Sequence, residues 1–361
     1  MRRIRGVWAC LLCLSAVNFI GCGGSSSSGT HTAYVTLPQF NQVAVYSIDD
    51  EKGTFKKISK NPIFAGASAT ATVLHPSKKF LYVANQSENT ISLFMVGRGA
   101  ALTEVMPRTA TGVSPGALTV DPSGNFVFVL NVLGNSVSAF TINSSSGALT
   151  EVSGSPVPTG LAPSKLAVAP SGNFLYVTNQ NSNSLSVYSI TSGTGVLTPI
   201  AGSPFSVPFS PSFLTFDPSG AFLYISYSSA NGFGLFSVNS TSGVPTSASP
   251  VPYAAGTNPA GLAVDPSGKF LFVANFASAN VSVFTIDAAS GIPTQVAKSP
   301  FTAGTDPLFV SVDPSGSFVF TGNQTSKNIS SFTLDATTGE LTAVSGSPFA
   351  TSGSVSSMAI E

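Results

Sequence analysis

Short apolar segments recur along the chain, and each is separated from the next by a polar turn. One kind of segment reads LYVAN at residues 81–85 and LYVTN at residues 175–179. Runs of four to eight apolar residues bounded by Gly, Pro and Ser are typical of buried β-strands. Copies of this strand begin at residues 33, 81, 127, 175, 223, 271 and 319. The strand after each copy alternates and carries one aromatic residue at a fixed place: Tyr46, Phe94, Phe140, Tyr188, Phe236, Phe284 and Phe332.

A turn motif repeats with a constant spacing. Between residues 121 and 313 the Asp-Pro-Ser-Gly turn or its variant recurs every 48 residues. The aspartates are Asp121, Asp217, Asp265 and Asp313, and His75 and Ala169 occupy the same slot in two variants. A fixed period of this length indicates a repeat architecture. Proline presets φ and glycine closes such a turn, so we expect these aspartates to cap turns rather than to form a metal-binding ring.

Each repeat predicts a small sheet of four strands. In one unit we expect an inner strand at 261–264, a second strand at 270–275, a third at 281–286 and a short fourth strand before Pro300. Proline cannot donate a ladder hydrogen bond, so it belongs at a sheet edge. It recurs there in every unit: Pro62, Pro107, Pro156, Pro204, Pro250, Pro300 and Pro348. The first three strands are apolar on both faces, which is typical of sheets stacked as the blades of a propeller.

The two ends of the repeat region complement each other. Residues 33–36 form a second-type strand without an inner partner, and residues 357–360 form an inner strand without successors. Pairing them would complete a seventh sheet and remove the open edges. The sequence therefore predicts an all-β, seven-bladed β-propeller with four-stranded blades over residues 32–361.

The N-terminus has the features of an export signal. Three arginines among the first five residues precede an apolar stretch at residues 7–20. The stretch ends in FIGC at residues 19–22, which resembles the lipobox of bacterial lipoproteins; ordinary signal cleavage near residue 21 is the alternative. We expect a signal peptide at 1–21, a lipid-anchored tether at 22–31 that joins lipidated Cys22 to the propeller, and a location in the cell envelope, at the periplasm or the cell surface.

Charge and histidine are scarce, which narrows the possible functions. The 361 residues include 15 Lys and Arg, 15 Asp and Glu and 2 His, with a formal net charge of zero and a mean hydropathy of +0.32. Without basic clusters large enough to neutralise a phosphate backbone, nucleic acid is excluded as a partner. Cleavage of the signal peptide would leave Cys22 as the only cysteine of the mature chain, so neither a disulfide within the chain nor a cysteine metal site is expected. We expect no cofactor, no metal and a monomer.

The strand and turn motifs resemble a known family. YVTN at residues 176–179 and YVAN at residues 82–85, together with the Asp-Pro-Ser-Gly turns, resemble the YVTN-repeat propellers. Among these, the chain is similar to the seven-bladed lactonase family, named for a 6-phosphogluconolactonase, over residues 32–361. The resemblance implies lactone hydrolysis, with related members closing muconolactones, by His, Arg and acidic residues around the central channel. No matching constellation is present, so no catalytic residue is carried over.

Candidate site residues follow from the predicted blades. Propeller ligands usually meet the face made by loops between second and third strands and by loops leading into the next inner strand. Polar residues mapped to it are Glu88, Arg108, Lys165, Lys298, Asp306 and Lys327. Aromatic residues mapped to it are Phe209, Phe213, Tyr227, Phe233, Tyr253, Phe276 and Phe309. His31 and His75 fall on the opposite face, so a histidine base is missing there.

Of these residues, the catalytic candidates are Arg108, Lys165, Asp306 and Glu88. The ligand-binding candidates are Tyr227, Tyr253, Asn131, Asn179 and Asn275. The asparagines end second strands, where they equally suit loop backbone groups. Gly-Val-Ser-Pro-Gly at residues 112–116 matches a nucleophile elbow, but proline after the serine removes the N–H that such an elbow uses.

Two functions remain open. The first is a lipid-anchored propeller that binds a protein, a glycan or a small ligand, which is favoured by small polar loops and scarce catalytic groups. The second is a lactone hydrolase. One lysine cluster falls on the outer hairpin of the first blade, where it would discourage edge pairing or contact anionic headgroups: Lys52, Lys56, Lys57 and Lys60.

Overall fold

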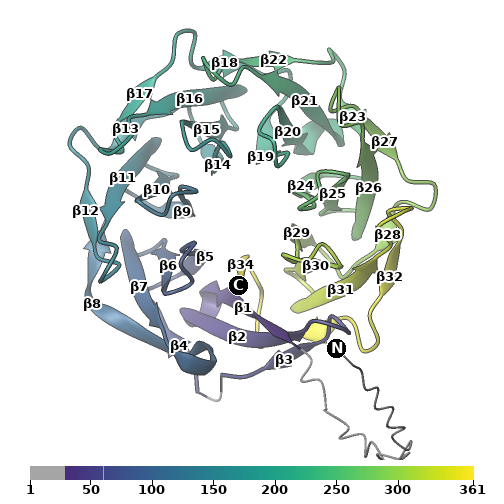
Figure 1. Ribbon diagram of the computed structural model, residues 1–361, viewed down its shortest axis with the longest axis horizontal. Coiled ribbons are helices and arrows are strands. Elements are labelled where there is room, and N and C mark those ends of the chain that lie inside the picture. Colours follow the sequence, from purple (N-terminus) through teal and green to yellow (C-terminus); the bar gives the residue numbers. More distant parts are fainter. Residues whose placement is uncertain (1–28, 60) are drawn as a thin grey trace, which may run out of the picture.

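A computed structural model describes residues 29–59 and 61–361, which form seven sheets around a central axis (Figure 1). The predicted signal peptide and residues 22–28 of the predicted tether, including Cys22, lie outside the described residues. The first strand begins at Thr30, two residues before the expected start of the propeller. No helix of the described part of the chain is long and apolar enough to cross a membrane. The predicted seven-bladed propeller is confirmed.

Each blade is an antiparallel sheet whose innermost strand lines the axis. Blade 1 consists of β34 (Ser357–Ile360), β1 (Thr30–Leu37), β2 (Gln42–Asp49), β3 (Phe55–Lys57) and β4 (Ile63–Phe64). Blade 2 consists of β5 (Ala69–Leu74), β6 (Phe80–Asn85), β7 (Thr90–Val96) and β8 (Leu102–Ala110). Blade 3 consists of β9 (Pro115–Val120), β10 (Phe126–Asn131), β11 (Ser136–Ile142), β12 (Leu149–Glu151) and β13 (Val157–Pro158).

The remaining blades repeat the pattern of blade 3. Blade 4 consists of β14 (Pro163–Val168), β15 (Phe174–Asn179), β16 (Ser184–Ile190), β17 (Leu197–Pro199) and β18 (Phe205–Ser206). Blade 5 consists of β19 (Pro211–Phe216), β20 (Phe222–Tyr227), β21 (Gly232–Val238), β22 (Pro245–Ser247) and β23 (Tyr253–Ala254). Blade 6 consists of β24 (Pro259–Val264), β25 (Phe270–Asn275), β26 (Asn280–Ile286), β27 (Pro293–Gln295) and β28 (Phe301–Thr302). Blade 7 consists of β29 (Pro307–Val312), β30 (Phe318–Asn323), β31 (Asn328–Leu334), β32 (Leu341–Ala343) and β33 (Phe349–Ala350). Three short 3₁₀ turns are η1 (Pro38–Phe40), η2 (Arg98–Ala100) and η3 (Ser228–Ala230).

The fourth strand differs from the expected one. In six blades the fourth strand continues after the proline as a separate piece of two residues, which pairs with the same third strand. In blade 6, for example, β27 pairs with β26 before Pro300 and β28 pairs with β26 after it. In blade 2 the fourth strand, β8, runs on as one strand with a register shift. The proline thus interrupts the edge strand without ending it, since an edge residue needs no second ladder partner.

The ring closes where the sequence predicts. β34 pairs antiparallel with β1 from Ala33 opposite Ile360 to Thr36 opposite Ser357. The innermost strand of blade 1 therefore comes from the C-terminus and the rest of that blade from the N-terminal part of the propeller (Figure 1). This pairing covers an edge of β1 that would otherwise be open.

The Asp-Pro-Ser-Gly turns form one face, which we call the turn face, and the loops between second and third strands form the other, the loop face. In blade 6, Asp265 Oδ1 accepts from Phe270 N at 2.6 Å and Oδ2 accepts from Ser267 N at 3.0 Å. Gly268 closes the turn with a φ of +75°. The four turn aspartates are 2 to 7% exposed, and their carboxylate oxygens accept hydrogen bonds from backbone N–H groups of the turn. They therefore cap the turns, as predicted.

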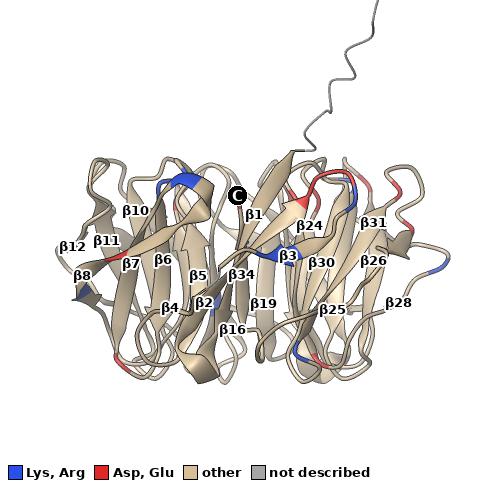
Figure 2. Cartoon of the chain, turned by 90° about the horizontal axis from the view of Figure 1, so that it is seen from below, with Lys and Arg blue, Asp and Glu red and all other residues tan. Residues whose placement is uncertain are grey.

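Neighbouring blades pack through second strands that are almost entirely buried and through the buried first five or so residues of the third strands. Between blades 5 and 6 the core includes Tyr224, Phe233, Leu262, Leu271 and Phe284. The Tyr224 hydroxyl donates to the carbonyl of Gly291 in the next blade at 2.7 Å, and its burial raises the pKa of this phenol. Charged residues lie mostly in turns and on outer strands (Figure 2). The low share of charged residues in the sequence therefore reflects the large buried area between blades.

Candidate functional site

A cavity of about 310 Å³ occupies the loop-face half of the central channel. The first residues of the inner strands line it, including Thr70, Ser164, Lys165, Ser212, Phe213 and Ser356. Polar and apolar groups from different blades converge there, which is the usual composition of a small-molecule site.

Four hydroxyls form a belt around this cavity. The hydroxyl belt consists of Thr70, Ser164, Ser212 and Ser356, each at the second position of an inner strand or just before it. Each hydroxyl lies within hydrogen-bonding distance of a backbone carbonyl of the next blade. The Ser356 hydroxyl donates to the Thr70 carbonyl at 2.7 Å, and the Thr70 hydroxyl donates to the Pro115 carbonyl at 3.3 Å. The Ser164 hydroxyl donates to the Pro211 carbonyl at 3.1 Å, and the Ser212 hydroxyl donates to the Pro259 carbonyl at 3.2 Å. The belt therefore ties blades together at the mouth of the channel.

Lys165 is the one charged residue that lines the cavity within the described residues. It is half-buried on β14, and its Nζ lies 4.4 Å from the centre of the Phe213 ring on the neighbouring inner strand. Removal from water lowers the pKa of this amine to about 8. No described carboxylate lies within salt-bridge distance of it. The channel thus holds a cation whose favourable internal contact is an aromatic face.

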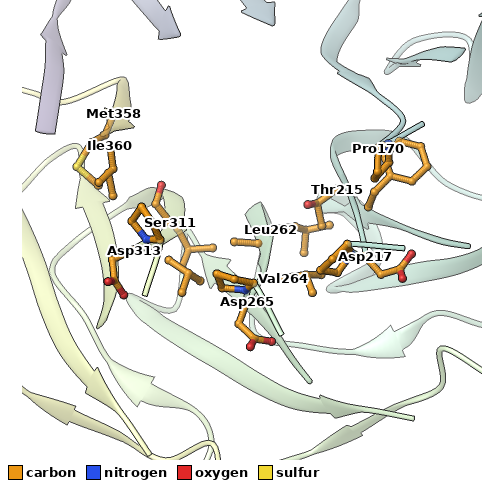
Figure 3. Close-up of a pocket in the computed structure, with 17 residues that line it drawn as sticks. Pro170, Thr215, Asp217, Leu262, Val264, Asp265, Ser311, Asp313, Met358 and Ile360 are labelled. Carbon is orange, nitrogen blue, oxygen red and sulfur yellow. The ribbon is translucent and has the colours of Figure 1, made fainter. Parts of the chain in front are cut away.

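A second cavity of about 450 Å³ opens at the turn face of the channel. Apolar residues and turn prolines line most of it, including Leu262, Val264, Met358 and Ile360. The carboxylates of Asp217, Asp265 and Asp313 point away from the channel axis (Figure 3). At this end of the channel, therefore, the aspartate carboxylates are not directed at a ligand in the cavity.

The four catalytic candidates do not converge. Arg108 lies on β8, the outermost strand of blade 2, where Nη1 is 2.9 Å from Glu88 and Nε is 2.8 Å from Glu104. Asp306 precedes β29 on the loop face and accepts a hydrogen bond from the Thr325 hydroxyl. Only Lys165 lines the channel. Arg108 and Glu88 therefore lie away from the channel, and their opposite charges neutralise each other.

The asparagine candidates are fully buried within their blades. Asn179 donates through Nδ2 to Ser184 at 3.1 Å and Ser186 at 3.0 Å, and Asn131 and Asn275 bond equivalent residues. With 0% exposure these amides hold together the second and third strands. They are not accessible to a ligand in this conformation.

The aromatic candidates gather in blade 5. Tyr227 is 1% exposed, and its hydroxyl finds no partner among the described residues. Its ring lies 5.7 Å from Phe209, while Tyr253 stacks on fully buried Phe233 at 5.6 Å. Phe309 packs back toward Gly322, and half-buried Phe276 follows β25. Of the mapped aromatic residues, Phe213 and Phe309 line the channel cavity.

Several residues have clear structural roles. His75 bonds Ser77 at 2.7 Å and the Gly124 carbonyl at 2.8 Å, and His31 contacts Asp50 at 2.6 Å, both on the turn face as expected. Lys298, mapped to the loop face from sequence, instead lies on the outer edge and pairs with Glu340 at 2.8 Å. Lys327 lines a separate loop-face cavity with Gln39 and Gln324. In residues 29–59 and 61–361, no group of three His, Cys, Asp or Glu side chains could hold a metal ion.

Sequence reasoning missed the hydroxyl belt. Its signal is a small hydroxyl residue directly after the residue that opens an inner strand, as in Pro163-Ser164 and Pro211-Ser212. The sequence pattern alone does not reveal the belt, because each hydroxyl donates its hydrogen bond to a carbonyl of a neighbouring repeat.

The comparisons with known proteins agree with this fold. The model of the lactonase, seven-bladed beta-propeller family matches residues 26–162, 155–254, 205–306 and 245–356. A comparison with the sequences of curated proteins gives no significant match.

Solved structures with the same fold cover nearly the whole chain. A candidate 6-phosphogluconolactonase from Bacteroides fragilis is 19% identical with a TM-score of 0.83, covering 93% of this chain and 99% of its own. A protein from Lactobacillus plantarum is 20% identical with a TM-score of 0.79, covering 92% and 100%. The periplasmic gluconolactonase of Pseudomonas aeruginosa is 18% identical with a TM-score of 0.77, covering 92% and 99%. At these identities the similarity shows a shared fold. Because the matches to the family model together cover residues 26–356 without a gap, the chain belongs to the lactonase family of seven-bladed β-propellers.

Proposed function

We propose that this propeller is a binding module that holds a small polar molecule in the loop-face half of its channel. The observation that carries the proposal is the cavity of about 310 Å³, in which hydroxyls, an aromatic face and one ammonium converge from several blades. Convergent polar groups in an otherwise apolar concave site are the mark of small-molecule binding. A protein or a glycan bound by the loops would instead contact the rim outside this cavity.

Hydrolysis is the second candidate, and one observation favours it. Ring opening of a lactone needs a base for water and stabilisation of the oxyanion. The cavity lining contains neither a carboxylate nor an imidazole. Lys165, with its pKa lowered to about 8, would be partly neutral near pH 8 and could accept a proton. The family membership and this amine support lactone hydrolysis, while the missing second catalytic group supports binding alone.

A hydrolysis panel on the purified full-length protein separates the two functions. Sugar lactones and simple lactones are followed in a pH-stat, and binding of the same compounds and their open-chain forms is measured by calorimetry. Binding without turnover supports the binding module. Turnover that Lys165→Ala abolishes and Arg108→Ala leaves intact would assign the chain as a lactone hydrolase. Absence of both binding and turnover would overturn both functions.

We also propose that the protein is anchored in the cell envelope through lipidated Cys22. The support is the positively charged start, the apolar stretch and the FIGC sequence at residues 19–22. Metabolic labelling with a radioactive fatty acid tests the proposal. Label should appear in the wild-type protein and be absent from Cys22→Ser; equal labelling of both, or none in either, would contradict it.

A further inference from the structure

We infer that Lys165 is a nucleophile that captures small uncharged aldehydes and ketones in the channel cavity by forming a reversible imine. The inference rests on the proposed small-molecule site and adds to it a ligand class and a covalent bond. It follows from the place of Lys165 in the repeat, from its surroundings and from the chemistry of a primary amine.

Lys165 departs from the pattern that the other repeats follow. It lies on β14 opposite Thr178, the residue before the strand-ending asparagine of β15. The corresponding position in the other six blades holds a small or apolar residue: Ala71, Ala117, Phe213, Gly261, Phe309 and Ser357. A blade therefore forms without a lysine here. A break in a local pattern of this kind is expected where a residue serves function rather than folding.

The backbone of Lys165 is held in a fixed place. The pairing of β14 with β15 shifts register between Pro163 and Lys165. Such irregularities in a strand often redirect a side chain beside a functional site. The Lys165 N–H donates to the Thr178 hydroxyl at 3.1 Å, and the same hydroxyl lies 3.3 Å from the Lys165 carbonyl. The side chain thus enters the cavity from a well-positioned strand.

The surroundings of the amine favour its neutral form. Nζ lies 4.4 Å from the centre of the Phe213 ring, and no described carboxylate lies within salt-bridge distance. The strands packed against β14 are β9, β10, β15 and β19, and Tyr176 on β15 is their one titratable residue. Its hydroxyl donates to the Gly243 carbonyl at 2.6 Å. No titratable group of these strands therefore holds the proton on Lys165.

Burial increases the share of amine that can react. Removal from water lowers the pKa of Lys165 to about 8. At pH 7 about a tenth of this amine is then neutral, against about 0.03% of an ordinary lysine. A lysine that is desolvated in this way is a recognised form of activated nucleophile.

The reaction needs no partner beyond the carbonyl compound. The nitrogen lone pair forms a C–N bond as the C=O double bond opens, and one proton moves from nitrogen to oxygen. Loss of water then leaves a C=N bond, and nothing is oxidised or reduced. Attack on a lactone would instead end in an amide and consume Lys165, so reversible capture selects aldehydes and ketones. No second cation lines the cavity in the described part of the chain, which favours uncharged compounds over oxo acids.

Reductive trapping with acetone tests the inference. The full-length protein is incubated at pH 7 with acetone and sodium cyanoborohydride, which reduces an imine to a stable secondary amine, and modified peptides are quantified by mass spectrometry over time. Lys165 should be modified about tenfold faster than the exposed Lys56 and Lys327, because its larger neutral fraction outweighs the lower nucleophilicity of a weaker base. Without the reductant no stable adduct should form. Lys165→Met should lack the fast site and leave the rates at Lys56 and Lys327 unchanged.

The pH dependence supplies a readout that accessibility alone would not move. The ratio of the rate at Lys165 to the rate at an exposed lysine should fall as the pH rises from 7 to 10. Lys165 is already neutral above about pH 9, whereas the neutral fraction of an ordinary lysine still increases there. A ratio that stays constant with pH would contradict an activated amine.

The outcomes separate this inference from the proposed binding function. Trapping at Lys165 no faster than at Lys56 and Lys327 would overturn the inference. Calorimetric binding of lactones or their open-chain forms involves no covalent bond, so binding without trapping would leave the binding function standing and remove the nucleophile. Trapping without such binding would support the nucleophile and contradict the proposed non-covalent site.

Discussion

Replacing Lys165 with Met is expected to stabilise the unliganded protein at neutral pH. Methionine has a similar length and no charge, so it keeps the contact with Phe213 and removes the poorly solvated ammonium. Lys165 would then lower the stability of the unliganded protein while contributing to ligand binding, a trade-off that is common in binding sites.

The magnitude follows from the pKa of the amine. Burial lowers it from 10.5 to about 8, and this difference corresponds to about 3 kcal/mol. Below pH 8 both the folded and the unfolded chain are protonated, so the folded state carries the full penalty. Between pH 8 and 10.5 the unfolded chain binds the additional proton, so stability rises with pH. Since water in the channel screens the charge, we expect Lys165→Met to gain about 1–3 kcal/mol at pH 6.5.

Guanidinium unfolding of wild type and variant at pH 6.5 and pH 10.5 measures the effect. The gain should be large at pH 6.5 and nearly absent at pH 10.5. Lys56→Met, on the exposed edge strand β3, is the matched control and should change little at either pH. If Lys165→Met were less stable than wild type at pH 6.5, the ammonium would have a stabilising internal partner, and the expected burial penalty would be wrong.

Three further changes test other parts of the structure. Asp265→Ala removes the acceptor of Phe270 N and should lower the free energy of unfolding by about 1–3 kcal/mol; unchanged denaturant midpoints would contradict the capping role. Gly234→Ser should destabilise blade 5, since a Cβ there meets the Tyr227 hydroxyl at 2.6 Å. Adding Tyr227→Asn should restore stability by recreating the Asn–Ser pair of other blades, and an additive double-mutant cycle would argue against this substitution pattern. Arg108→Ala should leave ligand affinity in calorimetry unchanged, because its partners are peripheral; a large loss of affinity would place the site on blade 2.

The repeat architecture was predictable because its signals are local. The turn aspartates, the strand-ending asparagines and the edge prolines each act within one blade, so their spacing in sequence reports their spacing in the ring. Closure was predictable for the same reason, since residues 33–36 and 357–360 each lack a neighbour that the repeat requires. The continuation of the fourth strand beyond proline was missed, because a piece of two residues is too short to show a strand pattern in the sequence.

The candidate site was less predictable because it depends on contacts between repeats. Ser356 and Thr70 are 286 residues apart in the chain and bond across the seam of the ring. Arg108 and Glu88 fall on the same face in sequence reasoning, yet their mutual contact at the periphery leaves no charge for a ligand. Lys165 was identified from its place near the start of an inner strand. Its isolation from carboxylates became visible only in the assembled channel.

A crystal structure of the protein soaked with gluconate would show where in the propeller a small polar molecule binds. We expect ligand density in the loop-face half of the channel, with the carboxylate within hydrogen-bonding distance of Lys165 Nζ and hydroxyls against Ser164 and Ser212. Density at the turn-face cavity, at the Arg108–Glu88 pair or beside Lys327, with the loop-face channel empty, would contradict it.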